Sequence, residues 1–293
     1  MRSYLIPAIA ATVVLAGGGL IYVGLDSSSD SAGEAVVASP SPTGPSPEEL
    51  AAAERAKRVK QLDAALKKVP TGGAEFSVAV LDAKTGETYA YRGATKYDTA
   101  SIVKADILAC MLLKAQDADR EPTAKEMNLA KPMIQVSDNN ATTSLFQRIG
   151  GKAAVTKCNK RLGLTATTVD VHWGLTRTTA ADQVKLLTAF DSAEGPLDEE
   201  SQKTAFDLMT GVDEEQDWGV PSIAAERETA TVKNGWDTRD ADGGKWVVNT
   251  IGRVTSDDVD VSVAVLSHDN KSQEAGIKLV EKVAKATRQY LKY

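Results

Sequence analysis

Ser101 and Lys104 stand three residues apart where the sequence predicts the start of a helix. Residues at this spacing share one face of a helix, so the Lys104 amine can reach the Ser101 hydroxyl. A serine hydroxyl becomes a strong nucleophile when a base removes its proton, and burial can lower the pKa of a lysine until it serves as that base. The backbone N–H of Ser101 could also stabilise an oxyanion. We therefore interpret Ser101 as a candidate nucleophile and Lys104 as its base, although Ser-x-x-Lys alone is also a chance pattern.

A second polar group, Ser137-Asp138-Asn139, lies between two helical patterns. A serine in such a loop could pass a proton to a leaving group, and the Asn139 side chain could hold a substrate amide. The same residue types also favour the N-cap of a helix, so the segment could simply begin the helix near Asn140. Both interpretations stay open; in the first, Ser137 is catalytic and Asn139 binds substrate.

A third group, Lys233-Asn234-Gly235-Trp236, ends a stretch of β-type residues. A glycine in a strand lets a substrate backbone approach closely, and the Lys233 ammonium would attract a substrate carboxylate. The alternative is an ordinary strand end that enters a turn. In the functional interpretation, all four residues are candidate substrate-binding residues.

The elements that must position these groups follow from the periodicity of apolar residues. Apolar residues recur at helical spacing at the start of the folded chain, through much of its middle and at its end. Stretches rich in β-type residues fill the two intervals between these helical parts. The predicted helical segments are residues 46–69, 101–210 with several breaks, and 271–290. The predicted strands are residues 76–81, 88–91, 229–232, 246–254 and 259–266.

This order of elements predicts an α+β fold with two lobes. A five-stranded antiparallel sheet would be flanked by the N- and C-terminal helices, with an inserted all-α lobe of about residues 101–228. The whole domain would span residues 46–293. Substrate sites often lie where two such lobes meet, so we expect the three polar groups to converge there.

The N-terminal part of the chain has a different composition. Residues 4–25 carry no charge over 22 positions, which is enough to cross a bilayer as a helix, so residues 1–25 are predicted to be a signal anchor. A cleaved signal peptide is the alternative, because small residues that suit cleavage occur at 36–38. Residues 26–45 are rich in Ser and Pro and predict a disordered linker. The domain would then lie at the extracytoplasmic face of the cell membrane, or be secreted after cleavage.

The overall composition excludes several classes of function. The net charge of -6 argues against a nucleic-acid partner, which would require a basic stripe. The two histidines and two cysteines lack the number and spacing of a zinc site, so we expect no metal, no cofactor, and a monomer that takes a small-molecule substrate. Cys110 and Cys158 fall in helical, partly apolar stretches and are interpreted as two buried, unlinked side chains. A disulfide is the alternative, since an exported domain permits one.

Taken together and in this order, the three polar groups resemble the Ser-x-x-Lys, Ser-Asp-Asn and Lys-Thr-Gly motifs of the class A β-lactamase and penicillin-binding superfamily. The resemblance implies that Ser101 is acylated, that Lys104 activates it, and that Ser137 passes the proton to the leaving nitrogen. It also implies that Asn139 binds a substrate amide and that the N–H groups of Ser101 and Trp236 form the oxyanion hole.

The resemblance covers roughly residues 75–293, with one departure inside the motifs. Asn234 stands where relatives usually carry Thr or Ser. We expect its amide to offer a hydrogen bond to the substrate carboxylate in place of the usual hydroxyl. Lys233 would tune Ser137 electrostatically.

A second departure concerns the step that releases the acyl group. Class A β-lactamases use a glutamate on a long loop between the second and third motifs, and no matching string occurs here. Residues 163–178 form a shorter segment, with Asp170 as its only acid and His172 as the only other candidate base. Deacylation needs a positioned water and a base, so a β-lactam or a D-amino-acid peptide should acylate Ser101 and leave slowly.

Two other functions stay open. A protein that keeps this fold but lacks efficient turnover could be a penicillin-binding sensor or scaffold. The same nucleophile could also serve an esterase or amidase that acts on another substrate, because fold does not fix function.

Overall fold

A five-stranded sheet organises the part of the chain that the computed structural model describes, residues 44–238 and 240–293. The strand order is β2-β1-β7-β6-β5, and every neighbouring pair is antiparallel. The strands are β1 (Glu75–Asp82), β2 (Glu87–Tyr91), β5 (Thr229–Thr238), β6 (Trp246–Thr255) and β7 (Asp260–Asn270). The predicted five-stranded antiparallel sheet is confirmed.

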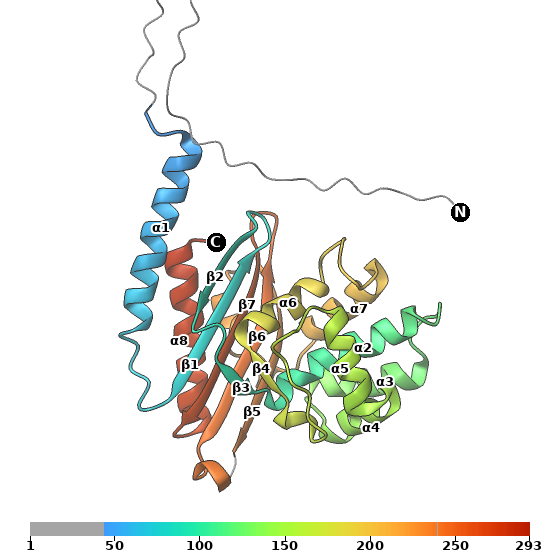
Figure 1. The fold of residues 1–293 in the computed structure, drawn as a ribbon. Coiled ribbons are helices and arrows are strands. Elements are labelled where there is room, and N and C mark those ends of the chain that lie inside the picture. The colour runs from blue at the N-terminus through green and yellow to red at the C-terminus, as the bar shows by residue number, and fades with distance from the viewer. Residues whose placement is uncertain (1–43, 239) are drawn as a thin grey trace, which may run out of the picture. The chain divides into compact units, whose positions relative to one another are not determined.

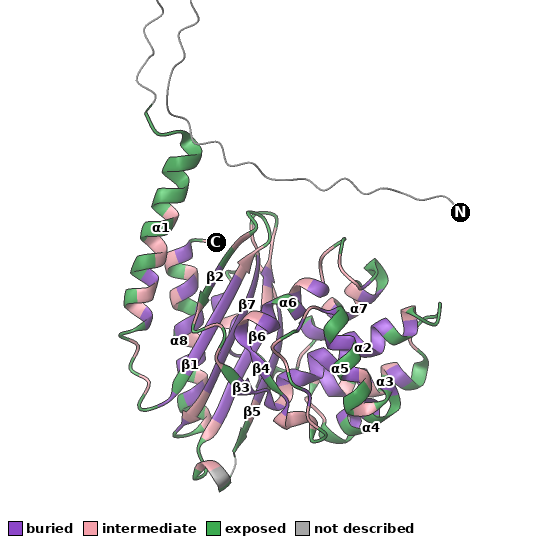
Figure 2. Cartoon of the chain, viewed as in Figure 1, coloured by how far each residue is buried: buried purple, intermediate pink, exposed green. Residues whose placement is uncertain are grey.

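Two terminal helices, α1 (Pro47–Leu66) and α8 (Gln273–Leu291), lie on the same face of this sheet (Figure 1). The helix predicted from Ser46 is present, because the Ser46 hydroxyl accepts the Glu49 N–H at 3.1 Å while the Glu49 carboxylate accepts the Ser46 N–H at 2.7 Å. This reciprocal capping box satisfies two backbone donors that a helix start leaves free. Only the second half of α1 reaches the core; its first half is exposed (Figure 2).

The opposite face of the sheet carries the predicted helical lobe (Figure 1). Its helices are α2 (Val103–Gln116), α3 (Ala124–Gln135), α4 (Asn139–Ile149), α5 (Gly151–Arg161), α6 (Ala180–Ala189) and α7 (Glu199–Thr210). Helix α2 is buried along nearly its whole length (Figure 2), as expected of a mostly apolar helix, and its buried residues include the polar Lys104 and Asp106. A helix held this firmly is a rigid support for the residues at its N-terminus.

A second, two-stranded sheet was not among the predicted elements. It pairs β3 (Lys96–Asp98) with β4 (Arg177–Thr179). Just beyond it, the Thr99 N–H donates to the Thr176 carbonyl at 2.8 Å. This small sheet therefore ties the turn before Ser101 to the end of the 163–178 segment.

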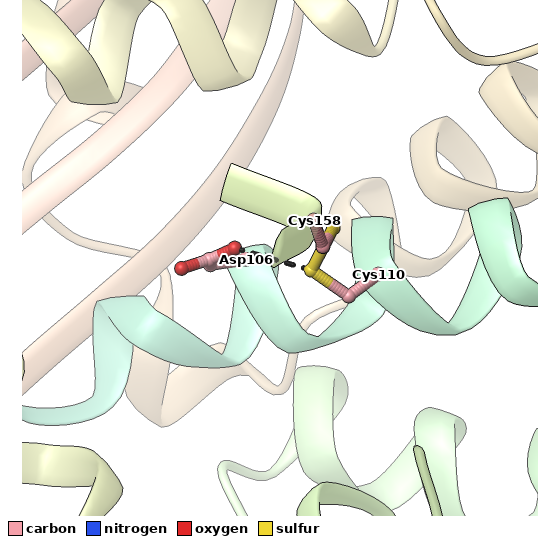
Figure 3. A group of neighbouring side chains, drawn as sticks. All are labelled: Asp106, Cys110 and Cys158. Carbon is pink, nitrogen blue, oxygen red and sulfur yellow. Dashed lines mark hydrogen bonds between the residues drawn. A yellow bond between two sulfur atoms is a disulfide. The ribbon is translucent and has the colours of Figure 1, made fainter. Parts of the chain in front are cut away.

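The interpretation of the cysteines as unlinked side chains is wrong. Cys110 on α2 and Cys158 on α5 form a disulfide (Figure 3). The two helices pack together, and their facing positions bring the Cα atoms to 5.7 Å, which lies within the range that a disulfide spans. A sequence separation of 48 residues gives no hint of this contact. Buried Asp106 lies beside the bridge, and its burial raises the carboxyl pKa to about 7.

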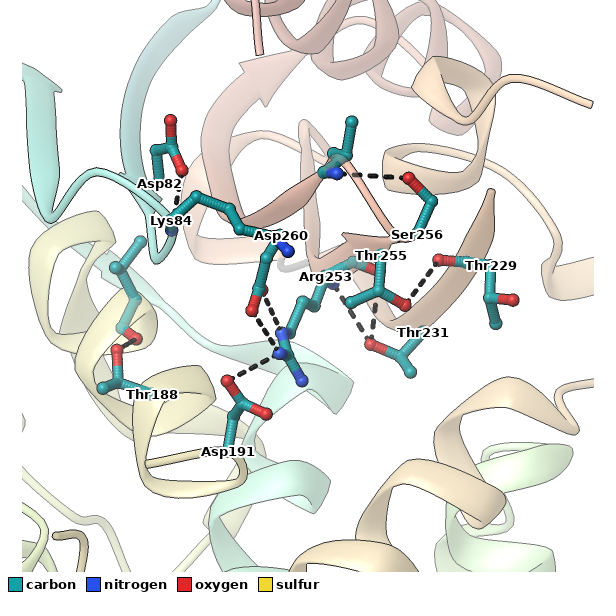
Figure 4. A network of polar contacts seen from close by, with 12 residues as sticks. Asp82, Lys84, Thr188, Asp191, Thr229, Thr231, Arg253, Thr255, Ser256 and Asp260 are labelled. Atoms are coloured by element: carbon teal, nitrogen blue, oxygen red, sulfur yellow. Dashed lines mark hydrogen bonds and ion pairs between the residues drawn. The ribbon is translucent and has the colours of Figure 1, made fainter. Parts of the chain in front are cut away.

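A partly buried guanidinium connects the helical lobe to the sheet near the end of α6. Arg253 of β6 contacts both oxygens of Asp260 on β7 at 2.7 Å and Asp191, just after α6, at 2.6 Å (Figure 4). Removing Arg253 would leave two partly exposed carboxylates close together without their shared cation, which would destabilise this contact. The contact fixes the end of α6 against the sheet.

The predicted signal anchor or signal peptide, residues 1–25, and most of the predicted linker, residues 26–45, lie outside the described residues. Among the helices of residues 44–238 and 240–293, none combines the length and the apolar character that a bilayer crossing requires.

Candidate active site

Ser101 lies in a short 3₁₀ turn, Ala100–Ile102, that leads directly into α2. The residue before it, Ala100, has a φ of 45°, a left-handed conformation that costs a residue with a Cβ on the order of 1–3 kcal/mol. Surrounding structure holds the turn in place. Asn249 of β6 donates from Nδ2 to the carbonyls of Asp98 and Thr99 at 2.9 and 3.1 Å.

Lys104, one turn into the same segment, contacts the hydroxyl of Ser101. Its Nζ lies 2.8 Å from Ser101 Oγ, and the side chain is 0% exposed. Burial lowers the Lys104 pKa to about 7, and the nearby Asp138 carboxylate opposes this shift only in part. An amine with this pKa is partly neutral near pH 7 and can accept a proton.

The Ser137-Asp138-Asn139 group combines both sequence interpretations. Asp138 caps α4 by accepting the Ala141 N–H at 2.6 Å. Ser137 and Asn139 face the nucleophile instead, because Lys104 Nζ contacts Ser137 Oγ at 2.9 Å and Asn139 Oδ1 at 2.8 Å. Ser137 itself has a φ of 56°, so the backbone adopts an unfavourable conformation where the side chain enters the site.

Lys233 reaches the same place from β5. Its Nζ lies 3.1 Å from Ser137 Oγ, and its side chain is 0% exposed. Burial is the main reason why the Lys233 pKa falls well below its ordinary value, and the neighbouring Lys104 adds to the effect. Ser137 Oγ is therefore shared by two amines from different lobes, and residues from three distant segments meet at one point.

Asn234 does not face this cluster. Its side chain is 1% exposed, and its Nδ2 donates to the carbonyls of Gln216 and Trp218 at 2.8 and 3.0 Å. Alternate strand residues point to opposite faces, so Asn234 points away when Lys233 points into the site. The expected hydrogen bond from Asn234 to a substrate carboxylate does not fit this geometry.

Gly235 places the edge of β5 directly against the nucleophile turn. A Cβ at this position would lie 2.7 Å from the backbone nitrogens of Ser101 and Ile102, which is closer than packed atoms allow. The close approach therefore requires glycine. It brings the next residue, Trp236, to the border of the space in front of Ser101.

An open cleft of about 360 Å³ lies in front of Ser101. One wall comes from β5, the other from the start of α4 and the 163–178 segment, and Ser101 lies between them. The lining residues are Ala100, Ser101, Asn139, His172, Trp173, Gly174, Leu175, Trp236 and Asp237. Ser101, Asn139 and Trp236 thus share one cleft, and their role as a substrate site stays a prediction.

The 163–178 segment contributes aromatic surface to the cleft. Trp173 has its ring 5.0 Å from Lys104 Nζ and donates from Nε1 to Thr143 at 3.2 Å. His172 also lines the cleft, whereas Asp170 does not and accepts the His172 N–H at 2.8 Å. Among the described residues, Asp237 is the sole carboxylate on the cleft wall.

Two residues that position the candidate site belong to none of the three predicted motifs. Asn249 holds the turn before Ser101, and its Oδ1 accepts the Ser267 N–H at 3.0 Å. The backbone carbonyl of Gln216 accepts a hydrogen bond from Asn234 Nδ2, and the Gln216 side-chain oxygen lies 3.5 Å from Lys233 Nζ. Neither residue belongs to a recognisable local pattern. The available signal for Asn249 was a polar residue directly after the apolar run of residues 246–248.

The fold and this serine–lysine site together define a class that includes serine β-lactamases and penicillin-binding proteins. A β-lactamase from Xanthomonas campestris superposes with a TM-score of 0.69 at 17% identity, over 80% of this chain and 98% of its own. PBP-A gives 0.68 at 18% identity, over 80% and 96%. A mutant of an ancestral class A β-lactamase of Gram-negative bacteria gives 0.67 at 21% identity, over 80% and 99%. These likenesses establish the fold.

The chain belongs to the Beta-lactamase enzyme family, whose model matches residues 121–291. Among curated proteins, "Putative lipoprotein LppW" of Mycobacterium tuberculosis is 31% identical over 172 residues, which is 56% of this chain and 54% of that protein. LppW of Mycobacterium bovis matches to the same extent. The chain thus spans about half the length of the curated relatives it matches.

Proposed function

We propose that this protein is a serine hydrolase that forms an acyl-enzyme with β-lactams or with D-amino-acid peptides. The observation that carries the proposal is the shared contact of three side chains. Lys104 Nζ lies 2.8 Å from Ser101 Oγ, and both Lys104 and Lys233 contact Ser137 Oγ. Family membership and a PBP-A mutant described as an acyl-enzyme complex with penicillin G support the same chemistry.

In the acylation step, neutral Lys104 takes the Ser101 proton while Ser101 Oγ attacks the carbonyl carbon of the substrate amide. A bond forms between Oγ and that carbon, and the carbon–nitrogen bond of the amide breaks. Ser137, held between the two lysines, delivers a proton to the departing nitrogen, and this proton is replaced from Lys104. Proton transfer by positioned side chains typically contributes about 10²–10⁴-fold to the rate.

The remaining site residues would hold the substrate during this step. The N–H groups of Ser101 and Trp236 would donate hydrogen bonds to the substrate carbonyl oxygen, because Gly235 brings the edge of β5 against the Ser101 backbone. Preorganised donors of this kind are each worth about 10²–10³ in rate. Asn139 uses its oxygen for Lys104, so its amide nitrogen would donate to a substrate carbonyl.

Release of the acyl group should be slow. Hydrolysis of the ester needs a water and a base beside it, and no Asp or Glu other than Asp237 lines the described cleft. Buried Asp182 instead anchors the shortened loop to α6, accepting from the Ala166 N–H at 2.8 Å. His172 is the remaining side chain in the loop that could act as a base at the cleft wall.

The direct test is covalent labelling with a fluorescent penicillin and, separately, with a fluorophosphonate. We expect penicillin to label the wild-type protein and the Ser101→Ala variant to lose the label. Labelling by the fluorophosphonate alone would instead favour an esterase or amidase that acts on another substrate. No label from either probe would overturn the catalytic proposal. Circular dichroism of the variant checks that it is folded.

A penicillin-binding sensor or scaffold is the second candidate, and the absence of a loop carboxylate from the described cleft favours it. Such a protein would take the label and keep it. We further propose that the domain is attached at the extracytoplasmic face of the membrane. The name of LppW and the Cys110–Cys158 disulfide, which suits an oxidising compartment, support this location.

A further inference from the structure

The strand that closes the cleft carries an acid whose position the proposed acylation does not use. Side chains two and four residues apart on a strand point to the same face. Lys233 points to the nucleophile cluster and Gly235 packs on the Ser101 backbone, so Asp237 belongs to the same face. It lines the cleft, as this register requires.

Asp237 has an oxygen available for a ligand. Its Oδ1 accepts the Thr238 N–H at 2.8 Å. Within residues 44–238 and 240–293, no lysine, arginine or histidine forms an ion pair with it. Its side chain is exposed to the cleft, so a ligand cation can reach it without a large desolvation cost.

The surroundings of Asp237 favour a cation over an anion. Trp173 lines the same cleft, and the faces of indole rings attract ammonium groups, as the Lys104 Nζ that lies 5.0 Å from this ring illustrates. The two lysines at the base of the site are buried, and burial lowers the pKa of each. Both lysines therefore carry less positive charge near pH 7 than ordinary lysines, so they neutralise less of the negative charge of Asp237. The residue expected to receive a substrate carboxylate, Asn234, points away from the cleft.

We infer that Asp237 is a specificity-determining residue that selects acyl donors bearing a protonated amine near the scissile amide. The inference rests on the proposed function, since it names the substrate class of that same site. The acyl part of a substrate bound at Ser101 would run between Asn139 and β5, and an amine on it would meet the carboxylate. A carboxylate at the same point of the substrate would be repelled.

A matched series of three penicillins tests this directly. Ampicillin, benzylpenicillin and carbenicillin share one ring system and differ at the α-carbon of the side chain, which carries an ammonium, no charge and a carboxylate, respectively. The second-order rate constant for acylation of Ser101 is measured for each by intact-protein mass spectrometry. The buffer is low in salt and at about pH 7, where an α-amino group is mostly protonated.

We expect the ampicillin-to-carbenicillin rate ratio to fall about three- to tenfold in Asp237→Asn, and to fall further in Asp237→Lys. This range corresponds to an exposed ion pair between Asp237 and the ampicillin ammonium, with an added cation–π contact to an indole ring. Comparison between variants cancels the different intrinsic reactivities of the three penicillins. At about 1 M salt, where the Debye length is about 3 Å, the effect should shrink.

Asp258→Asn is the matched control, because it removes the same charge from an exposed turn. The turn that contains Asp258 follows Thr255, the last residue of β6. Thr255 is seven residues from Val248, which pairs with Trp236, so at the rise of a strand the two ends are about 23 Å apart. The control should leave the ratio unchanged. If all three penicillins label Ser101 and Asp237→Asn does not alter the ratio, the inference is wrong while the proposed function stands. If none of the three labels Ser101, both are wrong.

Discussion

At the scale of single residues, the proposed general base is a lysine rather than a histidine or a carboxylate. Lys104 can serve because the fold removes it from water, which lowers its pKa to about 7. Its Nζ is surrounded by oxygens of Ser101, Ser137 and Asn139. The charged form can donate to several of them, and the neutral form keeps a lone pair for the Ser101 proton.

This environment predicts the pH dependence of acylation. Only neutral Lys104 can accept a proton, so the acylation rate should rise with pH through a midpoint near 7 and level off above about pH 8. The measurement is the rate of covalent labelling by benzylpenicillin between pH 5 and 9, which tests the reacting group without requiring turnover. Lys104→Ala should abolish the labelling while its circular dichroism stays like that of the wild type. A rate that does not change over this range would contradict the assignment of Lys104 as the base.

Which residues meet at the candidate site could be predicted from the motifs, but the direction of each side chain only in part. Ser101, Lys104, Ser137 and Lys233 converge as the motifs indicate. Asn234 does not, although it lies inside the third motif. Its direction follows from strand alternation and from the carbonyls of Gln216 and Trp218, which belong to a separate segment. A motif read along the chain contains no information about such acceptors.

At the scale of elements, α2 joins the catalytic turn to the rest of the lobe. Its N-terminus continues from Ser101, and its middle is linked to α5 by the Cys110–Cys158 bridge (Figure 3). The helix is buried along nearly its whole length. A change that makes α2 more mobile should therefore also displace Ser101 and Lys104, because Ser101 lies in the turn that leads into α2 and Lys104 lies in its first turn.

We expect loss of the disulfide to lower stability before it alters chemistry. Closing a loop of 48 residues stabilises a fold by about 4 kcal/mol in the chain-entropy account. Cys110→Ser with Cys158→Ser should lower the midpoint of denaturant unfolding accordingly, measured by circular dichroism in urea. Wild-type protein treated with a thiol reductant serves as a second comparison. An unchanged midpoint in both cases would show that the bridge does not form or does not constrain the unfolded chain.

Most elements could be predicted from periodicity because each has a long, regular apolar pattern. The missed sheet, β3 with β4, consists of three-residue strands, which are too short to show a period. The missed disulfide depends on how α2 and α5 pack, a tertiary property. Both features lie around the nucleophile turn or its helix, so the elements that position the site most closely were the least visible in the sequence.

At the scale of the whole molecule, the candidate site combines side chains from the sheet and from the helical lobe, which covers one face of that sheet (Figure 1). The sheet contributes Lys233 and the edge of β5, while the helical lobe contributes Ser101, Lys104 and Ser137. The shortened 163–178 segment supplies Trp173 and His172 to the cleft and no carboxylate within the described residues. Under the proposed function, this arrangement supports acylation, whereas Asp237 of β5 is the one carboxylate that the described residues place on the cleft wall.

The central claim is that Ser101 becomes acylated and stays acylated. Intact-protein mass spectrometry after brief mixing with benzylpenicillin, followed by removal of the free compound and a time course, tests it most directly. We expect one adduct with the full mass of benzylpenicillin, mapped to the peptide that contains Ser101, and we expect it to persist over many minutes. A rapid return to the unmodified mass with release of hydrolysed penicillin, or an adduct that forms equally in Ser101→Ala, would contradict it.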